Sequence, residues 1–206
     1  MKLNAGSVRK LELFLERIAN DTYPEPPSDL HSGITRQMLD QVLGTYPLPP
    51  GARILDVGCG QGVALEQFVA RGYAPIGITL NDEDLRACRD KGYDVRRMDQ
   101  SFLEFADASF DFVWCRHCLE HSIFPYFTLT ELGRVLRPGG HLYVEVPAPD
   151  TSCQHQTNQN HYSVLGKSMW LDLIRRAGFD TLASLDIGLT TQAGPDTYWA
   201  FIQRKP

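Results

Sequence analysis

The sequence lacks long apolar runs. No segment approaches the roughly 20 apolar residues of a membrane-spanning helix. Residues 1–20 carry charges every few positions and contain no secretory h-region, so we expect neither a signal peptide nor membrane association. Internal repeats and low-complexity tracts are also missing, which excludes fibrous proteins and extended disorder.

Cysteines and basic clusters are scarce as well. The five cysteines are odd in number and irregularly spaced, which indicates reduced thiols and a cytoplasmic location. No basic run offsets the formal net charge of -5, so broad binding to a nucleic-acid backbone is disfavoured, although a local basic site is not. A chain of 206 residues with ordinary globular composition suits one domain, with or without an appendage.

The N-terminal part predicts two helices. Apolar residues from Val8 to Ile18 recur at helical spacing after Ser7, a candidate N-cap. Three prolines within residues 23–28 interrupt any helix, because proline has no amide donor. A second helix is expected over residues 30–43, with Gly44 as its stop. The breaker at 47–51 marks a boundary between a helical cap or lid, residues 1–46, and the main fold, residues 47–206.

Strands and helices alternate through most of the main fold. Strands are expected at residues 53–57, 74–79, 93–97, 110–115 and 141–146, and helices at 63–70, 82–91, 124–136 and 163–177, with a turn at 137–140. Such alternation predicts an α/β fold with a parallel sheet covered on both faces. Residues 179–189 and 197–204 predict a hairpin with a turn at 193–196, which requires one antiparallel strand at or near an edge.

A glycine-rich loop follows the first expected strand, at residues 58–62. Glycines there let the backbone approach a ligand closely. The dinucleotide fingerprint fails, because Val63 stands where it requires glycine or alanine. Asp56 at the strand end would repel a pyrophosphate but attract a cation. S-adenosylmethionine carries an ammonium and a sulfonium and no phosphate, so it suits this loop; a tight turn without a ligand is the alternative.

The motif Asp-x-Gly-x-Gly-x-Gly at residues 56–62 resembles motif I of class I S-adenosylmethionine-dependent methyltransferases, of the type 11/23 kind. Residues 99–100, 109–113, 117–121, 132–140 and 177–179 resemble further segments of that family, and the resemblance covers residues 47–206. It implies a Rossmann-like, seven-stranded, mostly parallel sheet of order 3-2-1-4-5-7-6 with strand seven antiparallel. The implied cofactor-binding residues are Asp56, Gly58, Cys59, Gly60, Thr79, Leu80, Asp84, Asp99, Gln100 and Cys115.

One position departs from the family pattern. The second strand usually ends in an acid that binds both ribose hydroxyls, and Thr79 stands there. Residues 77–81 resemble the Gly-x-Thr-Leu-Ser form of cyclopropane-fatty-acid-synthase-like methyltransferases, in which the threonine, the next backbone group at Leu80 and a polar residue five positions on serve the cofactor. That resemblance implies that Asp84 supplies the carboxylate. An exposed place on a helix without a ligand is the alternative for Asp84.

Histidines gather after the fourth and fifth expected strands. His117, Glu120 and His121 lie at i, i+3 and i+4, so they would share one face if that turn is helical. His155 and His161 follow in a long polar loop, and loops of such length are often functional. Three interpretations stay open: local capping or packing, a general base from His117 or His121 that deprotonates the acceptor, and a metal site.

The metal interpretation comes from resemblance to two further families. Small-RNA 3′-terminal 2′-O-methyltransferases and, in part, ubiquinone-pathway O-methyltransferases carry a Glu-x-x-Glu-His motif and a later histidine that hold a divalent ion. The sequence has His117 in place of the first glutamate, and the implied ligands are His117, Glu120, His121 and His161. Three imidazoles and one carboxylate favour Fe, Zn, Mn or Co over Mg.

Cys115 and Cys118 form a Cys-x-x-Cys pair. Cys115 completes an expected buried strand, where free cysteine is common. No second pair exists elsewhere in the sequence, so a structural zinc site at these two residues is disfavoured.

The methyl acceptor is less determined than the donor. Methyl transfer is an in-line displacement in which the enzyme mainly aligns the reactants, so no dedicated nucleophile is needed. We expect a methyltransferase that acts on a small molecule, chiefly at oxygen; an RNA 3′ terminus as acceptor or a catalytically inactive S-adenosylmethionine-binding protein are the alternatives. Candidates for the acceptor pocket, or for core packing, are Trp170, Tyr162 and Phe124. Arg36 and Arg116 are candidates for anion contacts, or for solvated surface.

Overall fold

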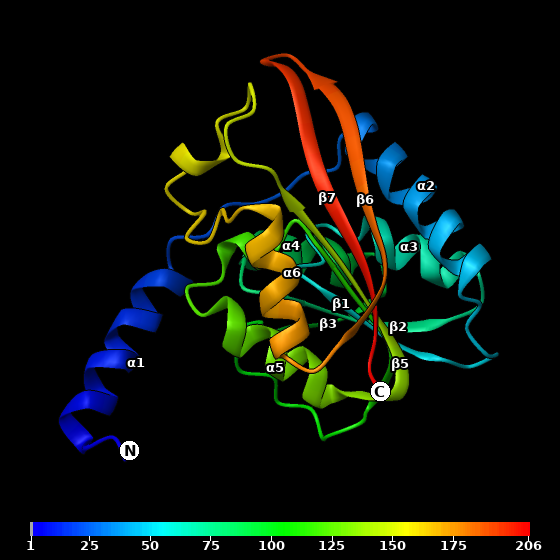
Figure 1. Ribbon diagram of the computed structural model, residues 1–206. Helices are drawn as coiled ribbons and strands as arrows, with labels where there is room; N and C mark the ends of the chain where they lie inside the picture. Colours follow the sequence, from blue (N-terminus) through cyan, green and yellow to red (C-terminus); the bar gives the residue numbers. More distant parts are fainter. Residues whose placement is uncertain (1) are drawn as a thin grey trace.

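The computed structural model describes residues 2–206, which form a seven-stranded sheet (Figure 1). Its strands are β1 (Arg53–Val57), β2 (Ala74–Thr79), β3 (Asp94–Arg97), β4 (Phe110–Arg116), β5 (Leu136–Pro147), β6 (Asp180–Thr191) and β7 (Gly194–Arg204). They lie in the order β3-β2-β1-β4-β5-β7-β6. Every pairing is parallel except the two that β7 makes. The predicted fold class, strand order and antiparallel strand are confirmed.

Helices cover both faces of this sheet (Figure 1). They are α1 (Ala5–Ala19), α2 (Asp29–Thr45), α3 (Val63–Ala70), α4 (Asp82–Asp90), α5 (Pro125–Val135) and α6 (Lys167–Arg176), with short 3-10 turns η1 (Leu119–His121) and η2 (His155–Thr157). Trp170 of α6 belongs to one apolar cluster, and Leu39 of α2 and Phe68 of α3 to a second. Val113 joins the first cluster and Trp114 the second, because successive side chains of a strand point to opposite faces.

The N-terminal helix α1 stands away from the sheet (Figure 1). None of its residues is buried. Its N-cap is Asn4, whose side chain accepts a hydrogen bond from the backbone N–H of Ser7 at 2.9 Å, so the predicted cap at Ser7 is wrong. No helix in the described part of the chain combines the length and the apolar character that crossing a bilayer requires.

Helix α2, in contrast, is part of the packed fold. Met38, Leu39 and Val42 are buried in the same cluster as Ile54 of β1. The helix runs through Gly44 to its end at Thr45, so the predicted stop is wrong; packing of its apolar face outweighs the weak helix propensity of one glycine. The division of the chain at residue 46 stays a prediction.

The turns at two strand ends differ from expectation. β5 begins at Leu136, so residues 137–140 belong to the strand and do not form the predicted turn. The register of β5 against β4 shifts between Phe110 and Phe112, as at a β-bulge. The β6–β7 hairpin turns at residues 192–193 rather than at 193–196, since Thr191 already pairs with Gly194. Loops of two residues are the commonest hairpin connection.

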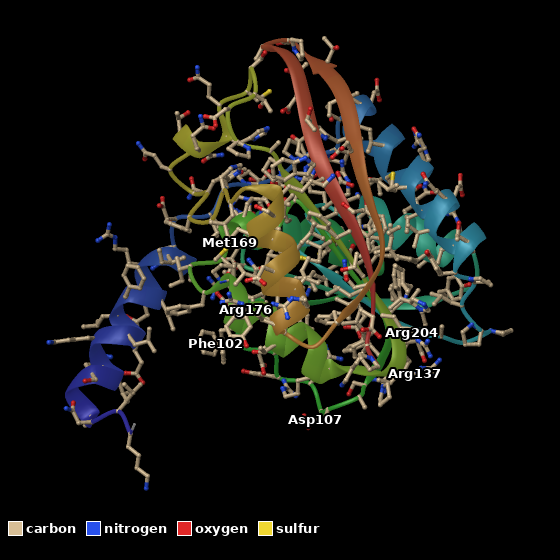
Figure 2. The ribbon with its side chains drawn as sticks, viewed as in Figure 1. Phe102, Asp107, Arg137, Met169, Arg176 and Arg204 are labelled. Carbon is tan, nitrogen blue, oxygen red and sulfur yellow. The ribbon has the colours of Figure 1, made fainter. Side chains whose placement is uncertain are left out.

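Helix α6 begins at Lys167, four residues later than predicted. Ser163 is instead an anchor of the preceding loop, because its backbone N–H donates to Glu120 O at 2.9 Å. Met169 and Arg176 lie on the outward side of the helix (Figure 2), and Met169 is 45% exposed. The loop before α6 thus returns to the end of β4, and it carries two histidines there.

Candidate functional site

The glycine loop between β1 and α3 is fastened to β2. The backbone N–H groups of Gly58 and Cys59 both donate to Ile78 O at 3.0 Å. Gly58, Gly60 and Gly62 all have positive φ, which side chains other than glycine rarely adopt. This path keeps the loop tight and places its backbone at the carboxyl edge of the sheet, where ligands bind in open α/β folds.

Two adjoining cavities open at this edge. Seven of the predicted cofactor residues line the first: Gly58, Gly60, Thr79, Leu80, Asp84, Asp99 and Gln100. Asp56 and Cys59 line the second, of about 440 Å³, which shares Gly58 and Gly60 with the first. Cys115 lines neither cavity, because its place in β4 buries its side chain fully in the core. The two cavities therefore give no support to the predicted contact between Cys115 and the cofactor.

Asp56 is a buried carboxylate at the mouth of the glycine loop. It is 2% exposed, and its Oδ2 has no hydrogen-bond partner among residues 2–206. Burial raises the pKa of Asp56 to about 7, and the charge of Arg116 opposes this rise. A buried carboxylate is favourable only when a donor or a cation faces it. The second cavity therefore suits the cationic end of a ligand.

Asp84 is buried at the first turn of α4, so the exposed alternative is wrong. The backbone N–H of Glu25 donates to both its carboxylate oxygens, at 3.2 and 3.3 Å. Burial raises the pKa of Asp84 although this bond opposes it, and burial together with Asp84 raises the pKa of Glu25 to about 7. Tyr23 and Glu25 thus line both cavities, and Pro24 between them lines the second.

The far end of the first cavity has ordered polar groups. Asp99 Oδ1 accepts the backbone N–H two residues further on, at 2.7 Å, and Gln100 Nε2 donates to Cys118 O at 2.9 Å. Leu15 and Ile18 from the last turns of α1 line the same cavity. The first cavity is thus bounded by apolar side chains on one side and by oriented amide and carboxylate groups on the other.

His117 is held apart from the other candidate metal ligands. Its φ is +50°, and η1 begins only at Leu119, so the helical turn that would align it with Glu120 and His121 does not form. Its Nε2 lies 2.8 Å from Glu145 Oε1, and its ring stacks on Tyr198 at 4.1 Å. Burial, and then the charge of Arg116, lower the pKa of His117 to about 3. The prediction of His117 as a ligand beside the other three is wrong.

Glu145 of β5 organises this corner of the second cavity, and the sequence carried no signal for it. It is fully buried, with Arg116 Nε at 3.0 Å from its Oε1 and Tyr143 OH donating to its Oε2. Burial alone would raise the pKa of Glu145, but Arg116 and the bond from His117 lower it to about 2. The carboxylate is therefore ionised and its charge is balanced by Arg116.

Glu120, His121 and His161 come together in the lining of the second cavity, and His121 lines the first as well. One ligand atom of each lies within 4.8 Å of the others. His121 Nδ1 lies 2.9 Å from Asn160 O, which makes Nδ1 the donor and leaves Nε2 with its lone pair free. Glu120 Oε2 and His161 Nδ1 are buried and have no partner within residues 2–206. Burial raises the pKa of Glu120 to about 8 and lowers that of His161 to about 4, so both groups are neutral without a ligand.

The remaining candidates, for the acceptor pocket and for anion contacts, do not all line a cavity. Tyr162 lines the first cavity and Arg116 the second. Trp170 is fully buried, as the core-packing alternative predicted, and Arg36 is exposed, as the solvated-surface alternative predicted. Phe124 lines neither cavity. Residues that the sequence interpretation missed also line the second cavity: His31 of α2 and Tyr198 of β7. Neither is near any motif, and the fold alone brings them to this place.

Comparison with known proteins adds to this geometry. Residues 55–144 match the family model described as a methyltransferase domain. The chain is 27% identical over 199 residues to the 27-O-demethylrifamycin SV methyltransferase of Amycolatopsis mediterranei, which covers 88% of the chain and 73% of that protein. It is 38% identical over 101 residues to the ubiquinone biosynthesis O-methyltransferase of Hahella chejuensis, covering 46% of the chain and only 42% of that protein.

Solved structures show the same fold. A SAM-dependent methyltransferase from Methanosarcina mazei superposes with a TM-score of 0.68 at 19% identity, covering 79% of the chain and 96% of that structure. The [4+2]-cyclase SpnF superposes with a TM-score of 0.69 at 22% identity, covering 83% of the chain and 80% of that structure. Likeness at such identities concerns the fold, and it includes a protein named for another reaction.

Proposed function

We propose that this chain, which belongs to the class I S-adenosylmethionine-dependent methyltransferases, transfers a methyl group to a hydroxyl oxygen of a small molecule. The observation that carries the proposal is the cluster of Glu120, His121 and His161, all of which line the second cavity. His121 lines both cavities, so an acceptor in the second would lie next to a donor in the first. Two relatives named for O-methylation support oxygen as the acceptor atom.

The residues fit the cofactor by charge and place. S-adenosylmethionine supplies an electrophilic methyl group on a sulfonium. Asp56, buried and without an ion-pair partner in the described chain, would face the cationic amino-acid end from the lining of the second cavity. Thr79 and Asp84 would bind the ribose and Asp99 the adenine of a cofactor in the first cavity. The carboxylates of this edge suit a cationic donor, and positioning supplies most of the rate gain in such a displacement.

The same cluster fits a divalent metal ion. Its orphaned atoms Glu120 Oε2 and His161 Nδ1 and the oriented His121 would hold it, with two imidazoles and one carboxylate that favour Fe, Zn, Mn or Co over Mg. A bound ion would lower the pKa of an acceptor hydroxyl. Residues 23–27 and α1 would act as a lid over the cofactor. We place the protein in the cytoplasm, and we expect a small molecule as the methyl acceptor.

The test follows the label from methyl-labelled S-adenosylmethionine after incubation with the small-molecule extract of the native cells. We expect one small product, with mass spectrometry locating the methyl group on oxygen. His121→Ala and His161→Ala should lower the rate at least tenfold. His141→Ala is the matched control, since His141 lines neither cavity, and it should leave the rate unchanged. Label in RNA, or cofactor binding without transfer to any acceptor, would overturn the proposal.

A further inference from the structure

A second cluster of ligand-type side chains lies outside the methyl-transfer site. We infer that Cys153, His155 and Asp196 bind a divalent metal ion, zinc by preference, and that this ion fastens the loop after β5 to the β6–β7 hairpin. One ligand atom of each residue lies within 4.8 Å of the others. Cys153 and His155 come from the loop, and Asp196 comes from β7.

The three side chains already converge on one point. His155 Nε2 lies 3.0 and 3.2 Å from the two carboxylate oxygens of Asp196, and Cys153 Sγ lies within 4.8 Å of the ligand atoms of both residues. Cys153 Sγ is 3.2 Å from Thr191 Oγ1 at the end of β6. The side chain of His155 is 13% exposed and that of Asp196 is fully buried. An ion could therefore take the place of the protons that now link these groups, with little movement of the chain.

Charge is the second reason for an ion here. Asp196 is a buried carboxylate, and within residues 2–206 no lysine or arginine forms an ion pair with it. Its one ion-pair partner is His155, which is positive only when protonated. The backbone N–H of Thr197 also donates to Asp196 Oδ1 at 2.8 Å, so hydrogen bonds hold the carboxylate in place, but no permanent positive charge offsets its own. A divalent cation supplies that charge at any pH at which it can displace the proton of the Cys153 thiol.

The ligand types select the metal. Thiolate, imidazole and carboxylate are the donors that zinc prefers, and three protein ligands with one open position are a known zinc arrangement. Magnesium and calcium prefer oxygen donors throughout. The cluster also differs chemically from Glu120, His121 and His161, which contain no sulfur.

The location indicates what the ion would do. Ala148 N donates to Thr197 O at 2.9 Å and Ser152 N to Pro195 O at 3.2 Å, so the loop is already tied to β7 by its backbone. The ring of His155 lies parallel to that of His161 at 5.8 Å between centroids. Fixing His155 therefore fixes the part of the loop that carries His161 to the cavities.

Cobalt distinguishes the two clusters, because only a thiolate ligand gives a sulfur-to-cobalt charge-transfer band in the near ultraviolet. The full chain, freed of metal with a chelator, is titrated with Co²⁺. We expect this band to grow to one equivalent, to vanish in Cys153→Ser and to persist in His161→Ala. Asp196→Asn should weaken Co²⁺ binding at this site at least tenfold while leaving the circular dichroism of the folded chain unchanged.

Cys118→Ser is the matched control, since Cys118 lies two residues from Glu120 and is the alternative source of a thiolate. A band that survives Cys153→Ser and vanishes in Cys118→Ser overturns the inference. So does a wild-type chain that shows no such band at saturating Co²⁺, which would mean that Asp196 and His155 form an ion pair only. Methyl transfer is measured separately, so either result leaves the proposed function standing.

Discussion

Gly58→Ala should damage the glycine loop by a collision that can be separated from backbone strain. A Cβ at Gly58 would lie 2.5 Å from Cys118 Sγ and 2.7 Å from Cys118 Cβ, and the φ of Gly58 is +70°. A Cβ atom of Cys118 cannot swing away as the end of a long side chain can. A side chain in the left-handed region costs about 1–2 kcal/mol, and overpacking adds about 1–3 kcal/mol, so the expected loss is about 2–5 kcal/mol.

Gly72→Ala is the matched control for strain alone. Its φ is +82°, and a Cβ there meets nothing within 4 Å, so only the cost of about 1–2 kcal/mol remains. Urea unfolding should place Gly58→Ala about 1–3 kcal/mol below Gly72→Ala. Calorimetry should show a midpoint lower by about 2–12 °C for a chain of this size. Isothermal titration should show S-adenosylmethionine binding weakened at least tenfold by Gly58→Ala and unchanged by Gly72→Ala.

A double-mutant cycle decides whether Cys118 is the cause. Cys118→Gly removes both colliding atoms. In a chain that carries Cys118→Gly, Gly58→Ala should therefore lose only the stability that backbone strain costs, which corresponds to a coupling energy of about 1–3 kcal/mol between the two positions. Equal losses for the two alanine variants, or zero coupling to Cys118, would refute the close approach between the glycine loop and the end of β4.

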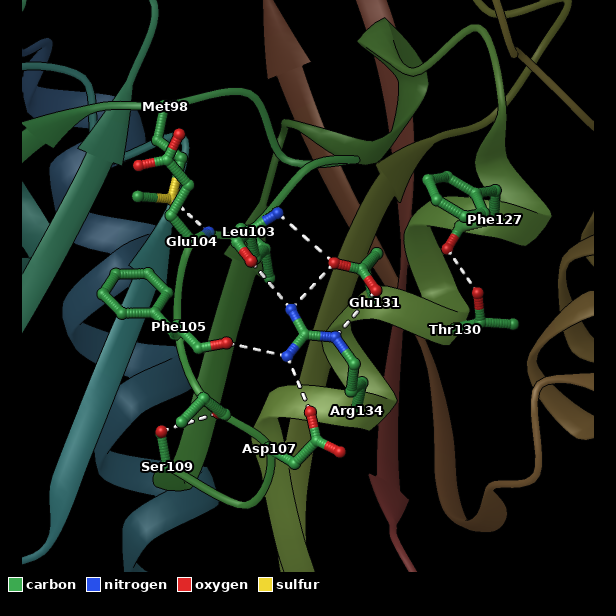
Figure 3. A network of polar contacts seen from close by, with 11 residues as sticks. Met98, Leu103, Glu104, Phe105, Asp107, Ser109, Phe127, Thr130, Glu131 and Arg134 are labelled. Carbon is green, nitrogen blue, oxygen red and sulfur yellow. Dashed lines mark hydrogen bonds and ion pairs between the residues drawn. The ribbon is translucent and has the colours of Figure 1, made fainter.

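Two further predictions concern charge. Arg134 of α5 donates to Leu103 O and Phe105 O at 2.7 Å and forms ion pairs with Asp107 and Glu131 (Figure 3), so Arg134→Ala should cost roughly 2–3 kcal/mol in urea unfolding at pH 7. Because Arg134 lowers the pKa of Glu131, part of that loss should disappear as the pH falls through the lowered pKa; a loss independent of pH would contradict this. Asp56 has its pKa raised to about 7, so the ligand-free chain should lose up to about 1.4 kcal/mol of stability per pH unit as the pH rises from about 4 to 7. Asp56→Asn should remove that share of the slope, and an unchanged slope in the variant would contradict the assignment.

The sequence predicts the sheet better than the site. Strands such as β1 and β4 are buried on both faces, so they appear in the sequence as short, mostly apolar runs that can be recognised without the structure. The motif at residues 56–62 likewise identifies the cofactor edge, because its chemistry depends on local spacing. Segment ends are less predictable, since tertiary contacts decide them: Ser163 anchors a loop instead of starting α6.

The histidines show why the rest of the site was not predictable. Spacing at i, i+3 and i+4 aligns residues only on a helix. The left-handed backbone conformation of His117 places it outside any helical turn, so the expected alignment does not form. Its partner Glu145 lies in β5 and its stacking partner Tyr198 in β7, far along the chain. Such contacts depend on strand order and register, which a local pattern does not contain. The pairing of Asp196 with His155 has the same origin.

Charge balance in the second cavity bears on the acceptor. Arg116 was a candidate anion contact, but its positive charge is balanced by the fully buried Glu145 at 3.0 Å. Asp56 and Glu120 of the same lining have raised pKa values and bring no positive charge. A carboxylate or phosphate on the acceptor would therefore find no unbalanced cationic side chain in the described lining to offset the cost of its burial. Arg116 Nη2 has no hydrogen-bond partner within residues 2–206, so it can donate to a neutral oxygen. The cavity thus favours an uncharged, oxygen-rich acceptor over an anionic one.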